Sequence, residues 1–258
     1  MSDSRTALVA RADDAGMCRT VNVAIRDACR QGIVRNVSVM VPAPAFAEAA
    51  EIFRKMDDIA VGLHLDLTAE WAAPRWGPIL PPEEVPTLVD EDGNFFHTPR
   101  ELAANGATPE HMQAETLAQL QRARDHGLDI AYLDAHMGVG RVNELYVWLR
   151  DFCERENLVY NGELFRQGRL RRLPAVEGAA DQVERVVKGL EMAEPGVYLL
   201  VGHPVYVTDE METAHLPGQA PGIEARRRDE QRRMLMESAV LNAVRDLNVD
   251  LLKYTEVP

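Results

Sequence analysis

Two adjacent aspartates near the start of the chain have the most readily interpreted chemistry. Asp13 and Asp14 follow a short β-like run, Thr6 to Val9. Neighbouring carboxylates repel each other unless a divalent cation or a shared proton offsets their charge, so such pairs gather at functional sites. A helix N-cap ahead of Val21–Gln31 is the alternative, but it would use one aspartate only, and the helical pattern begins several residues later. We therefore favour a functional site.

Three histidines are placed in a similar way. His64, His136 and His203 each lie where an apolar, β-type segment gives way to a loop. A lone histidine of this kind is more often structural than ligating. In parallel α/β folds, however, the carboxyl ends of the strands share one face, so these histidines and the aspartate pair are expected to meet. One Asp and two His, with positions open for water and substrate, are a ligand set typical of hydrolytic metal sites.

These motifs resemble the YdjC-like family of carbohydrate deacetylases. The resemblance implies that Asp14, His64 and His136 bind one divalent metal ion and that Asp13 is the catalytic base. It leaves the ion open, because Zn, Mg, Mn, Co and Ni all suit this ligand set to differing degrees. The motifs keep their order from about Ala7 to Thr255, and they are Ala12-Asp13-Asp14-Ala15-Gly16, Val21–Ile25, Gly62–Thr68, Leu133–His136 and His203-Pro204.

The predicted enzyme is a carbohydrate N-deacetylase, which hydrolyses an amide bond with the help of a metal. Its substrate would be an N-acetylated sugar or oligosaccharide, either chito-oligosaccharide-like or an acetylglucosaminyl glycoconjugate. His203 is the candidate acid that protonates the departing amine. Asp66 and Asp134 are candidates to orient the ligating imidazoles. Two alternatives stay open: another metal-dependent hydrolase on the same barrel, such as a phosphodiesterase or cyclic amidase, and a non-catalytic sugar-binding protein.

The elements that must position these residues alternate between β and α patterns. Such alternation predicts an α/β fold with parallel strands and right-handed crossovers. We expect a TIM-barrel-like (β/α) barrel, irregular and with about seven parallel strands, as the resemblance also implies; an open doubly wound sheet is the alternative. The expected strands are 7–12, 36–41, 59–65, 130–134, 158–161, 197–201 and 250–253. The expected helices are 21–31, 44–55, 109–126, 143–155, 179–191 and 224–247.

Two irregular segments, at about 69–108 and 205–223, interrupt this pattern. Each follows a strand that ends in one of the histidines, so both are expected to rise over the same face as binding loops or lids. Trp71, Trp76 and Tyr206 in these segments would offer exposed rings to a sugar, although packing onto the barrel is the alternative for each. Arg227, near the start of the last long helix, is a further candidate for the substrate pocket, with a role on the surface as the alternative.

Composition sets the remaining expectations. The 258 residues suit one domain over 1–258, and 46% hydrophobic with 27% charged residues is ordinary for a globular protein. A net charge of −13 disfavours binding to nucleic acid. No run approaches the ~18 apolar residues of a membrane span, and no signal peptide is recognisable. The three cysteines form no disulfide framework. We expect a cytoplasmic enzyme with a small sugar as partner, compatible with a homo-oligomer.

Overall fold

A parallel β-sheet forms the centre of the molecule, and the order of its strands in space differs from their order in the sequence. The computed structural model describes residues 5–258. Its strands are β1 (Thr6–Ala15), β2 (Asn36–Val39), β3 (Ala60–Leu65), β4 (Ile130–Ala135), β5 (Val159–Tyr160), β6 (Arg171–Arg172), β7 (Gly196–Gly202) and β8 (Asp250–Leu251). The order across the sheet is β5-β4-β3-β2-β1-β7-β6, and β8 pairs with β1. Every pairing is parallel.

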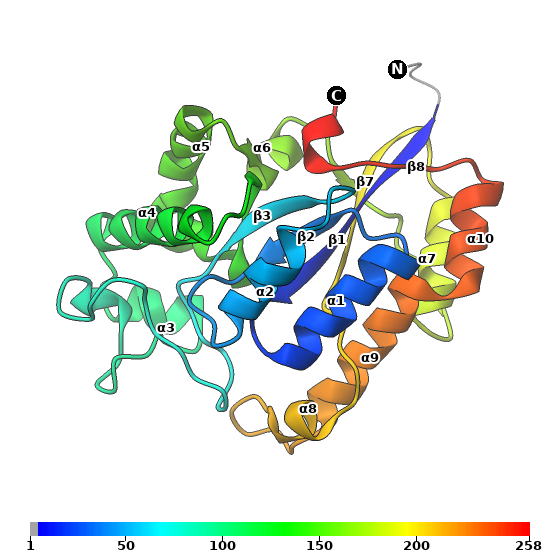
Figure 1. Ribbon diagram of the computed structural model, residues 1–258. Helices are drawn as coiled ribbons and strands as arrows, with labels where there is room; N and C mark the ends of the chain where they lie inside the picture. The colour runs from blue at the N-terminus through cyan, green and yellow to red at the C-terminus, as the bar shows by residue number, and fades with distance from the viewer. Residues whose placement is uncertain (1–4) are drawn as a thin grey trace.

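Helices connect these strands and surround the sheet (Figure 1). They are α1 (Arg19–Gln31), α2 (Phe46–Phe53), α3 (Pro99–Ala104), α4 (Pro109–Asp125), α5 (Leu145–Glu156), α6 (Asn161–Arg166), α7 (Gln182–Glu191), α8 (Asp209–Thr213), α9 (Ile223–Met236) and α10 (Ser238–Asp246), with 3₁₀ helices η1 (Pro86–Leu88), η2 (His136–Glu144) and η3 (Tyr254–Glu256). Among residues 5–258, none of these helices combines the length and the apolar character needed to cross a bilayer.

The predicted barrel-like α/β architecture is confirmed. All seven expected strands are present, while the two-residue strand β6 was not predicted, because Arg171 and Arg172 are exposed and polar. The helix expected over 224–247 is wrong in one respect. The backbone of Glu237 is extended (ψ 139°), so the chain forms two helices there, and α10 turns to pack against α7.

The sheet separates two apolar regions, and β1 contributes to both. Leu8, Ala10 and Ala12 face the main core beneath the helices. Ala7 and Val9 belong to a smaller cluster on the other face, which the end of the chain fills with residues such as Tyr254. Because side chains alternate along a strand, the next two positions on this inner face are Arg11 and Asp13. Arg11 and Asp13 therefore follow directly on the smaller apolar cluster along the same face of β1.

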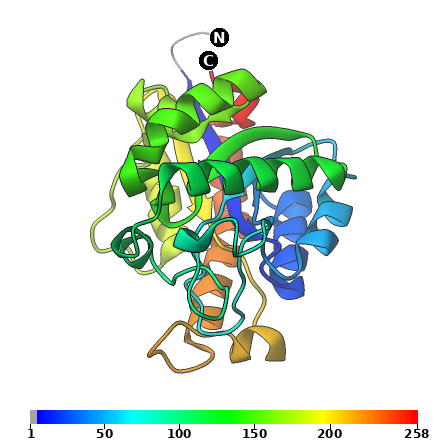
Figure 2. The ribbon, with the colours of Figure 1, turned by 90° about the vertical axis from the view of Figure 1, so that its left-hand side faces the viewer.

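The two irregular segments meet at the carboxyl end of the strands. An antiparallel bridge joins Ala73 to His215, and the Ala72 N–H donates to the His215 carbonyl at 2.9 Å. Only the short helices η1, α3 and α8 interrupt them. In Figure 1 they lie at the end of the molecule opposite to the two termini, and Figure 2 shows segment 69–108 below α4. Both segments thus border the end of the sheet where the histidines are found.

Candidate active site

Three side chains from separate segments meet at the carboxyl end of the sheet. Asp14 belongs to β1, His64 to β3, and His136 is the first residue of η2 after β4. Asp14 Oδ1 lies 3.5 Å from His64 Nε2 and 3.7 Å from His136 Nδ1, and the two ring nitrogens are 3.1 Å apart. The structure therefore brings together the three residues that the sequence motifs predicted as metal ligands.

The backbone at Asp14 explains how two consecutive aspartates can serve one site. Regular alternation would turn Asp14 towards the helices, away from Asp13. Asp14 instead has a φ of 68°, in the left-handed region that Asp tolerates better than most residues. The pairing of β1 with β2 is also irregular between Ala12 and Ala15. This local departure from the strand directs the carboxylate of Asp14 to the inner face.

The residues present fit a divalent metal ion. Asp14 Oδ1 is buried and has no hydrogen-bond partner within residues 5–258, a costly arrangement unless a cation completes it. Ligand atoms about 2 Å from a metal ion lie about 3–4 Å from one another, which agrees with the separations observed here. Four carboxylates but only two guanidinium groups contact the cluster, so a divalent ion would balance its charge. These groups are Asp13, Asp14, Glu70 and Asp134, with Arg11 and Arg228.

Each histidine is held by a carboxylate on its far side. Asp134 accepts from His64 Nδ1 at 2.7 Å, and Glu70 accepts from His136 Nε2 at 2.9 Å. Burial lowers the pKa of His136, but the carboxylates of Glu70, Asp66 and Asp14 together outweigh it and raise that pKa to about 9. Conversely, burial raises the pKa of Asp134, but Arg11, His64 and the hydroxyl of Ser38 together bring it down to about 2. Such carboxylate partners fix the ring orientation and make an imidazole a better ligand.

Arg228, on α9, anchors the second oxygen of Asp14. Its Nη1 donates to Asp14 Oδ2 at 2.6 Å, and its Nη2 lies 3.9 Å from Glu70. Burial alone would raise the pKa of Asp14, but the charge of Arg228 together with the neighbouring imidazoles holds it well below the usual range. The sequence predicts the neighbouring Arg227 as a pocket residue instead. That side chain is 62% exposed and pairs with Glu224, so it does not reach the cluster.

Asp13 lies beside the ligand cluster and is oriented by Arg11. The guanidinium of Arg11 donates to both of its carboxylate oxygens, at 2.6 and 2.8 Å. Arg11 is itself fixed by Asp134 at 3.1 Å and by the hydroxyl of Tyr254 at 2.9 Å. Asp13 Oδ2 is 4.0 Å from Nε2 of His203, so the predicted base and the predicted acid are close neighbours.

His203 is held by a single glutamine of α9. The side-chain oxygen of Gln231 accepts from the backbone N–H of His203 at 2.8 Å and from its Nδ1 at 2.9 Å. An amide oxygen only accepts, so Nδ1 carries a hydrogen. Nε2 is then the ring nitrogen that faces Asp13. The His203 side chain is 35% exposed, whereas Asp13 is buried, so a substrate could reach the imidazole.

The aromatic residues predicted to bind sugar are placed differently from the expectation. Trp71 is fully buried and lies under Arg228, whose guanidinium is 4.8 Å from the ring centre. Trp76 is also buried, and its indole N–H donates to Asp66 at 2.7 Å. The expectation of exposed rings is therefore wrong for both tryptophans, because Trp71 lies against the guanidinium of Arg228 and Trp76 donates to the buried carboxylate of Asp66.

Asp66 and Tyr206 also have partners other than those expected. Asp66 accepts from Trp76 and from the backbone of Thr68, and neither imidazole is its partner. Burial raises the pKa of Asp66 to about 7. The hydroxyl of Tyr206 donates to Asp27 at 3.0 Å, and Arg232 covers its ring. Asp134, by contrast, orients His64 as predicted.

Four residues of the site were not identified from the sequence: Arg11, Glu70, Arg228 and Gln231. Arg11 could have been identified from the sequence. It is an arginine within an apolar strand, and residues two positions apart on a strand lie on the same face, so Arg11 shares a face with Asp13. Glu70 lies in an irregular segment, and the other two lie on a helix rich in charged residues. Nothing in their local sequence distinguishes them from exposed polar residues.

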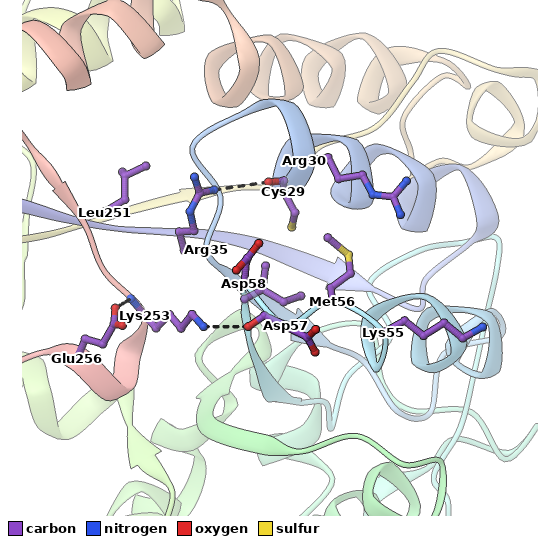
Figure 3. A pocket seen from close by; sticks show the side chains of 11 residues that line it. Cys29, Arg30, Arg35, Lys55, Met56, Asp57, Asp58, Leu251, Lys253 and Glu256 are labelled. Carbon is purple, nitrogen blue, oxygen red and sulfur yellow. Dashed lines mark hydrogen bonds between the residues drawn. The ribbon is translucent and has the colours of Figure 1, made fainter.

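A cavity at the other end of the sheet does not overlap this cluster (Figure 3). It has a volume of about 710 Å³ and lies where β2, β3 and β8 begin. Its polar groups bind each other: Lys253 donates to the carbonyl of Asp57 at 3.1 Å, and Arg35 donates to backbone carbonyls at the end of α1. None of the site residues predicted from the sequence lines it.

Comparisons with known proteins find relatives over nearly the whole chain. The carbohydrate deacetylase of Thermoanaerobacter pseudethanolicus is 25% identical over 260 residues, covering 96% of this chain and 98% of the relative. That of Brevibacillus brevis is 26% identical over 97% of this chain and 99% of its own length. A crystal structure of a candidate cellobiose-phosphate cleavage protein from Enterococcus faecalis shares the fold, with a TM-score of 0.80 and 23% identity over 98% of both chains. The sequence model of the YdjC-like protein family matches residues 7–246, nearly the whole chain, which therefore belongs to the YdjC-like family.

Proposed function

We propose that this chain is a metal-dependent deacetylase that hydrolyses the N-acetyl group of an N-acetylated sugar or oligosaccharide. The observation that carries the proposal is the convergence of Asp14, His64 and His136 around the unpartnered Oδ1 of Asp14, next to a carboxylate and an imidazole suited to proton transfer. The two full-length relatives described above are named carbohydrate deacetylases, which supports a sugar amide as substrate.

A bound divalent ion would lower the pKa of a water molecule and polarise the acetamide carbonyl. Asp13 is the base that takes the proton from the attacking water. A carboxylate offers about four lone-pair positions, and Arg11 occupies one on each oxygen. The remaining positions stay available, and the two-point contact fixes the direction in which they point. Arg11 thus orients the base.

His203 protonates the sugar amine as it leaves. Gln231 binds the Nδ1–H, so the proton to be transferred sits on Nε2, the atom 4.0 Å from Asp13. An imidazole can donate a proton near neutral pH, which an amine leaving group requires. The base and the acid lie side by side. Asp13 can therefore take a proton from the water, and His203 can give one to the amine, within the same part of the site.

We also propose a reducing, cytoplasmic environment. Cys18, Cys29 and Cys153 are all free and buried, and unpaired thiols are usual where disulfides do not persist. Burial raises the pKa of each thiol to about 12, so none is activated as a nucleophile. This agrees with chemistry performed by Asp13 and His203 and not by a cysteine.

The proposal is tested by acetate release after chelation and reloading with Zn, Mn, Co, Ni or Mg. The substrates are N-acetylglucosamine, N,N′-diacetylchitobiose and an acetylglucosaminyl glycoconjugate. Chelated protein should be inactive, and at least one ion should restore activity. His64→Ala should lose both metal and activity, whereas His126→Ala, an exposed histidine on the end of α4, should keep both. Acetate release that persists without metal, or its absence with every ion and substrate, would overturn the proposal.

A further inference from the structure

Tyr254 lies on the inner face of the sheet, in contact with the arginine that orients the proposed base. It belongs to η3, in the segment that follows β8, and it is 1% exposed. Its hydroxyl accepts a hydrogen bond from Arg11 Nη1 at 2.9 Å, and within residues 5–258 it is the one hydrogen-bond acceptor of that nitrogen. Asp13 binds the guanidinium through Nε and Nη2 instead. Tyr254 therefore holds the part of Arg11 that Asp13 leaves free.

A buried asparagine on β2 fixes the segment that carries Tyr254. The side-chain amide of Asn36 donates to the carbonyl of Leu252 at 2.9 Å, and its oxygen accepts from the backbone N–H of Tyr254 at 2.9 Å. The ring of Tyr254 also packs on Tyr132, with 4.2 Å between the ring centres. Two backbone contacts and one ring contact thus determine the position of the hydroxyl before any substrate binds.

The hydrogen bonds of the Tyr254 hydroxyl have a fixed direction. A guanidinium only donates, so the hydroxyl oxygen accepts from Arg11. Its own hydrogen then points to the side-chain oxygen of Asn161, 3.0 Å away. Burial raises the pKa of Tyr254, so the phenol keeps this hydrogen. The hydroxyl is satisfied on both sides, and it offers Arg11 a neutral acceptor in one direction only.

Arg11 needs this further contact because two carboxylates share it. Its Nη2 lies 2.8 Å from Asp13 Oδ2 and 3.1 Å from Asp134 Oδ2, so one nitrogen serves both. A carboxylate pairs most strongly with two guanidinium nitrogens at once, so the two aspartates compete for Arg11. The hydroxyl of Tyr254 occupies Nη1 and thereby opposes a turn of the guanidinium towards Asp134.

We propose that Tyr254 is a positioning residue of the catalytic base: it fixes the guanidinium of Arg11, and Arg11 in turn fixes the carboxylate of Asp13. The inference rests on the proposed deacetylase function, in which Asp13 takes the proton of the attacking water. Because Tyr254 is buried, it does not contact the substrate. Its hydroxyl should therefore affect turnover and not substrate binding.

Tyr254→Phe removes the hydroxyl and keeps the ring that packs on Tyr132. With metal bound, kcat should fall about tenfold at an unchanged KM, because a hydrogen bond to a charged group contributes about 10- to 100-fold. The amide and an activated acetyl ester should lose rate alike, since both need the base that activates water. Tyr198→Phe is the matched control. It removes a similarly buried hydroxyl, which donates to the carbonyl of Glu194 at 2.8 Å, and should leave kcat unchanged.

A double-mutant cycle shows whether the effect passes through the base. Asp13→Asn should lower the rate by about 10²- to 10⁴-fold, and Tyr254→Phe added to it should cause no further loss, because residues that act as a unit are not additive. An equal loss in both backgrounds would mean that the hydroxyl is only structural and would overturn the proposal. Asn161→Ala removes the acceptor of the Tyr254 hydrogen. It should give a smaller loss with the same pattern, and it provides the test if Tyr254→Phe does not fold.

Nitrogen-15 NMR of the arginine side chains follows the same contact without turnover. The Nε–H of Arg11 donates to Asp13 at 2.6 Å, and its resonance is identified by its shift in Asp13→Asn. Tyr254→Phe should shift this resonance, and Tyr198→Phe should not. If no substrate is deacetylated but the resonance responds to Tyr254, the positioning role stands and the deacetylase proposal fails. An identical resonance in Tyr254→Phe and in the unaltered protein would overturn the positioning role.

Discussion

Arg228 donates to one carboxylate oxygen of Asp14 at 2.6 Å, and the other oxygen of the same carboxylate is buried without a hydrogen bond from any of residues 5–258. The two oxygens thus have separate tasks. The arginine neutralises the aspartate and fixes its rotation, which leaves Oδ1 directed at the nitrogens of His64 and His136. Arg228, on α9, therefore fixes the orientation of Asp14, although Asp14 itself belongs to the sheet.

Replacing Arg228 with methionine should destabilise the metal-free protein. Asp14 would keep a buried charge without its partner, and removing one member of a buried pair typically costs about 3–5 kcal/mol. The measurement is urea unfolding in the presence of a chelator. Arg227→Met is the matched control, since that side chain is 62% exposed. Equal stabilities of the two variants would show that Arg228 does not neutralise Asp14.

Replacing Glu70 with glutamine should weaken metal binding while leaving all three ligands in place. The carboxylate that accepts from His136 Nε2 at 2.9 Å would be lost, and such outer partners typically contribute about 10- to 100-fold in affinity. Competition with a coloured chelator gives the dissociation constant. Glu84→Gln, an exposed change in the same segment, should bind metal like the unaltered protein, and an unchanged constant for Glu70→Gln would contradict the assigned role.

Metal binding should release about one proton at pH 7. The pKa of His136 is raised to about 9 in the metal-free protein because Glu70, Asp66 and Asp14 together outweigh the effect of burial. His136 Nδ1 and His64 Nε2 are only 3.1 Å apart, so one proton is held between them, and a metal must displace it. Apparent affinity should therefore rise with pH until about pH 9 and then level off.

Calorimetry in buffers of different ionisation enthalpy counts this proton. The heat of metal binding should depend on the buffer at pH 7 and much less at pH 10. A heat that is independent of the buffer at pH 7 would mean that both imidazoles are already neutral before the metal arrives. His126, which is exposed and lies outside the cluster, should contribute nothing, so His126→Ala should give the same proton count.

Trp76→Phe should lower stability more than it changes the KM for sugar. The indole N–H is a hydrogen-bond donor to the buried carboxylate of Asp66, and an unsatisfied buried acceptor costs about 1–3 kcal/mol. Melting temperature and KM are measured on the same preparations. Trp148→Phe, which alters a half-buried ring stacked on Phe152, is the control. A large rise in KM with an unchanged melting temperature would contradict this prediction and indicate that Trp76 contacts the substrate.

The sequence was most informative where residue type and strand position agreed. Asp14, His64, His136 and His203 could be found because each is polar and ends an apolar run, and parallel strands bring such ends together. Asp134 was found for the same reason. Local pattern indicated these positions, and the resemblance to the YdjC-like family assigned their roles. The alternation of β and α segments predicted a parallel sheet, and the resemblance favoured a barrel over an open sheet.

The rest of the site depends on tertiary contacts. Arg227 and Arg228 are neighbours on a helix with a weak apolar pattern, and only the packing of α9 decides which of them faces Asp14. Glu70 and Trp71 lie in a segment without regular structure, so no periodicity indicates which side chain turns inward. The positive φ of Asp14 is likewise a property of the folded backbone. Sequence pattern could indicate that Asp13 and Asp14 share a site, but not how.

His203 should be required for amide hydrolysis and much less for hydrolysis of an activated ester. Its Nε2 faces Asp13 at 4.0 Å, while Gln231 holds Nδ1–H, so the imidazole can donate a proton from Nε2 to a departing amine. His203→Ala should retain metal and lose about 10²- to 10⁴-fold in kcat on the amide. The leaving group of an activated acetyl ester departs without that proton. The kcat for such an ester should therefore fall far less.

Gln231→Leu provides the positioning test for the same imidazole. It keeps His203 but removes the acceptor that fixes its tautomer and ring orientation. The variant should lower kcat on the amide without raising KM, and it should lower the rate on the activated ester much less, a difference that a purely structural change would not produce. Arg233→Leu, an exposed neighbour on α9, controls for damage to the helix. If amide and activated ester lose rate equally in His203→Ala, His203 is not the acid, and the leaving amine must take its proton from another group.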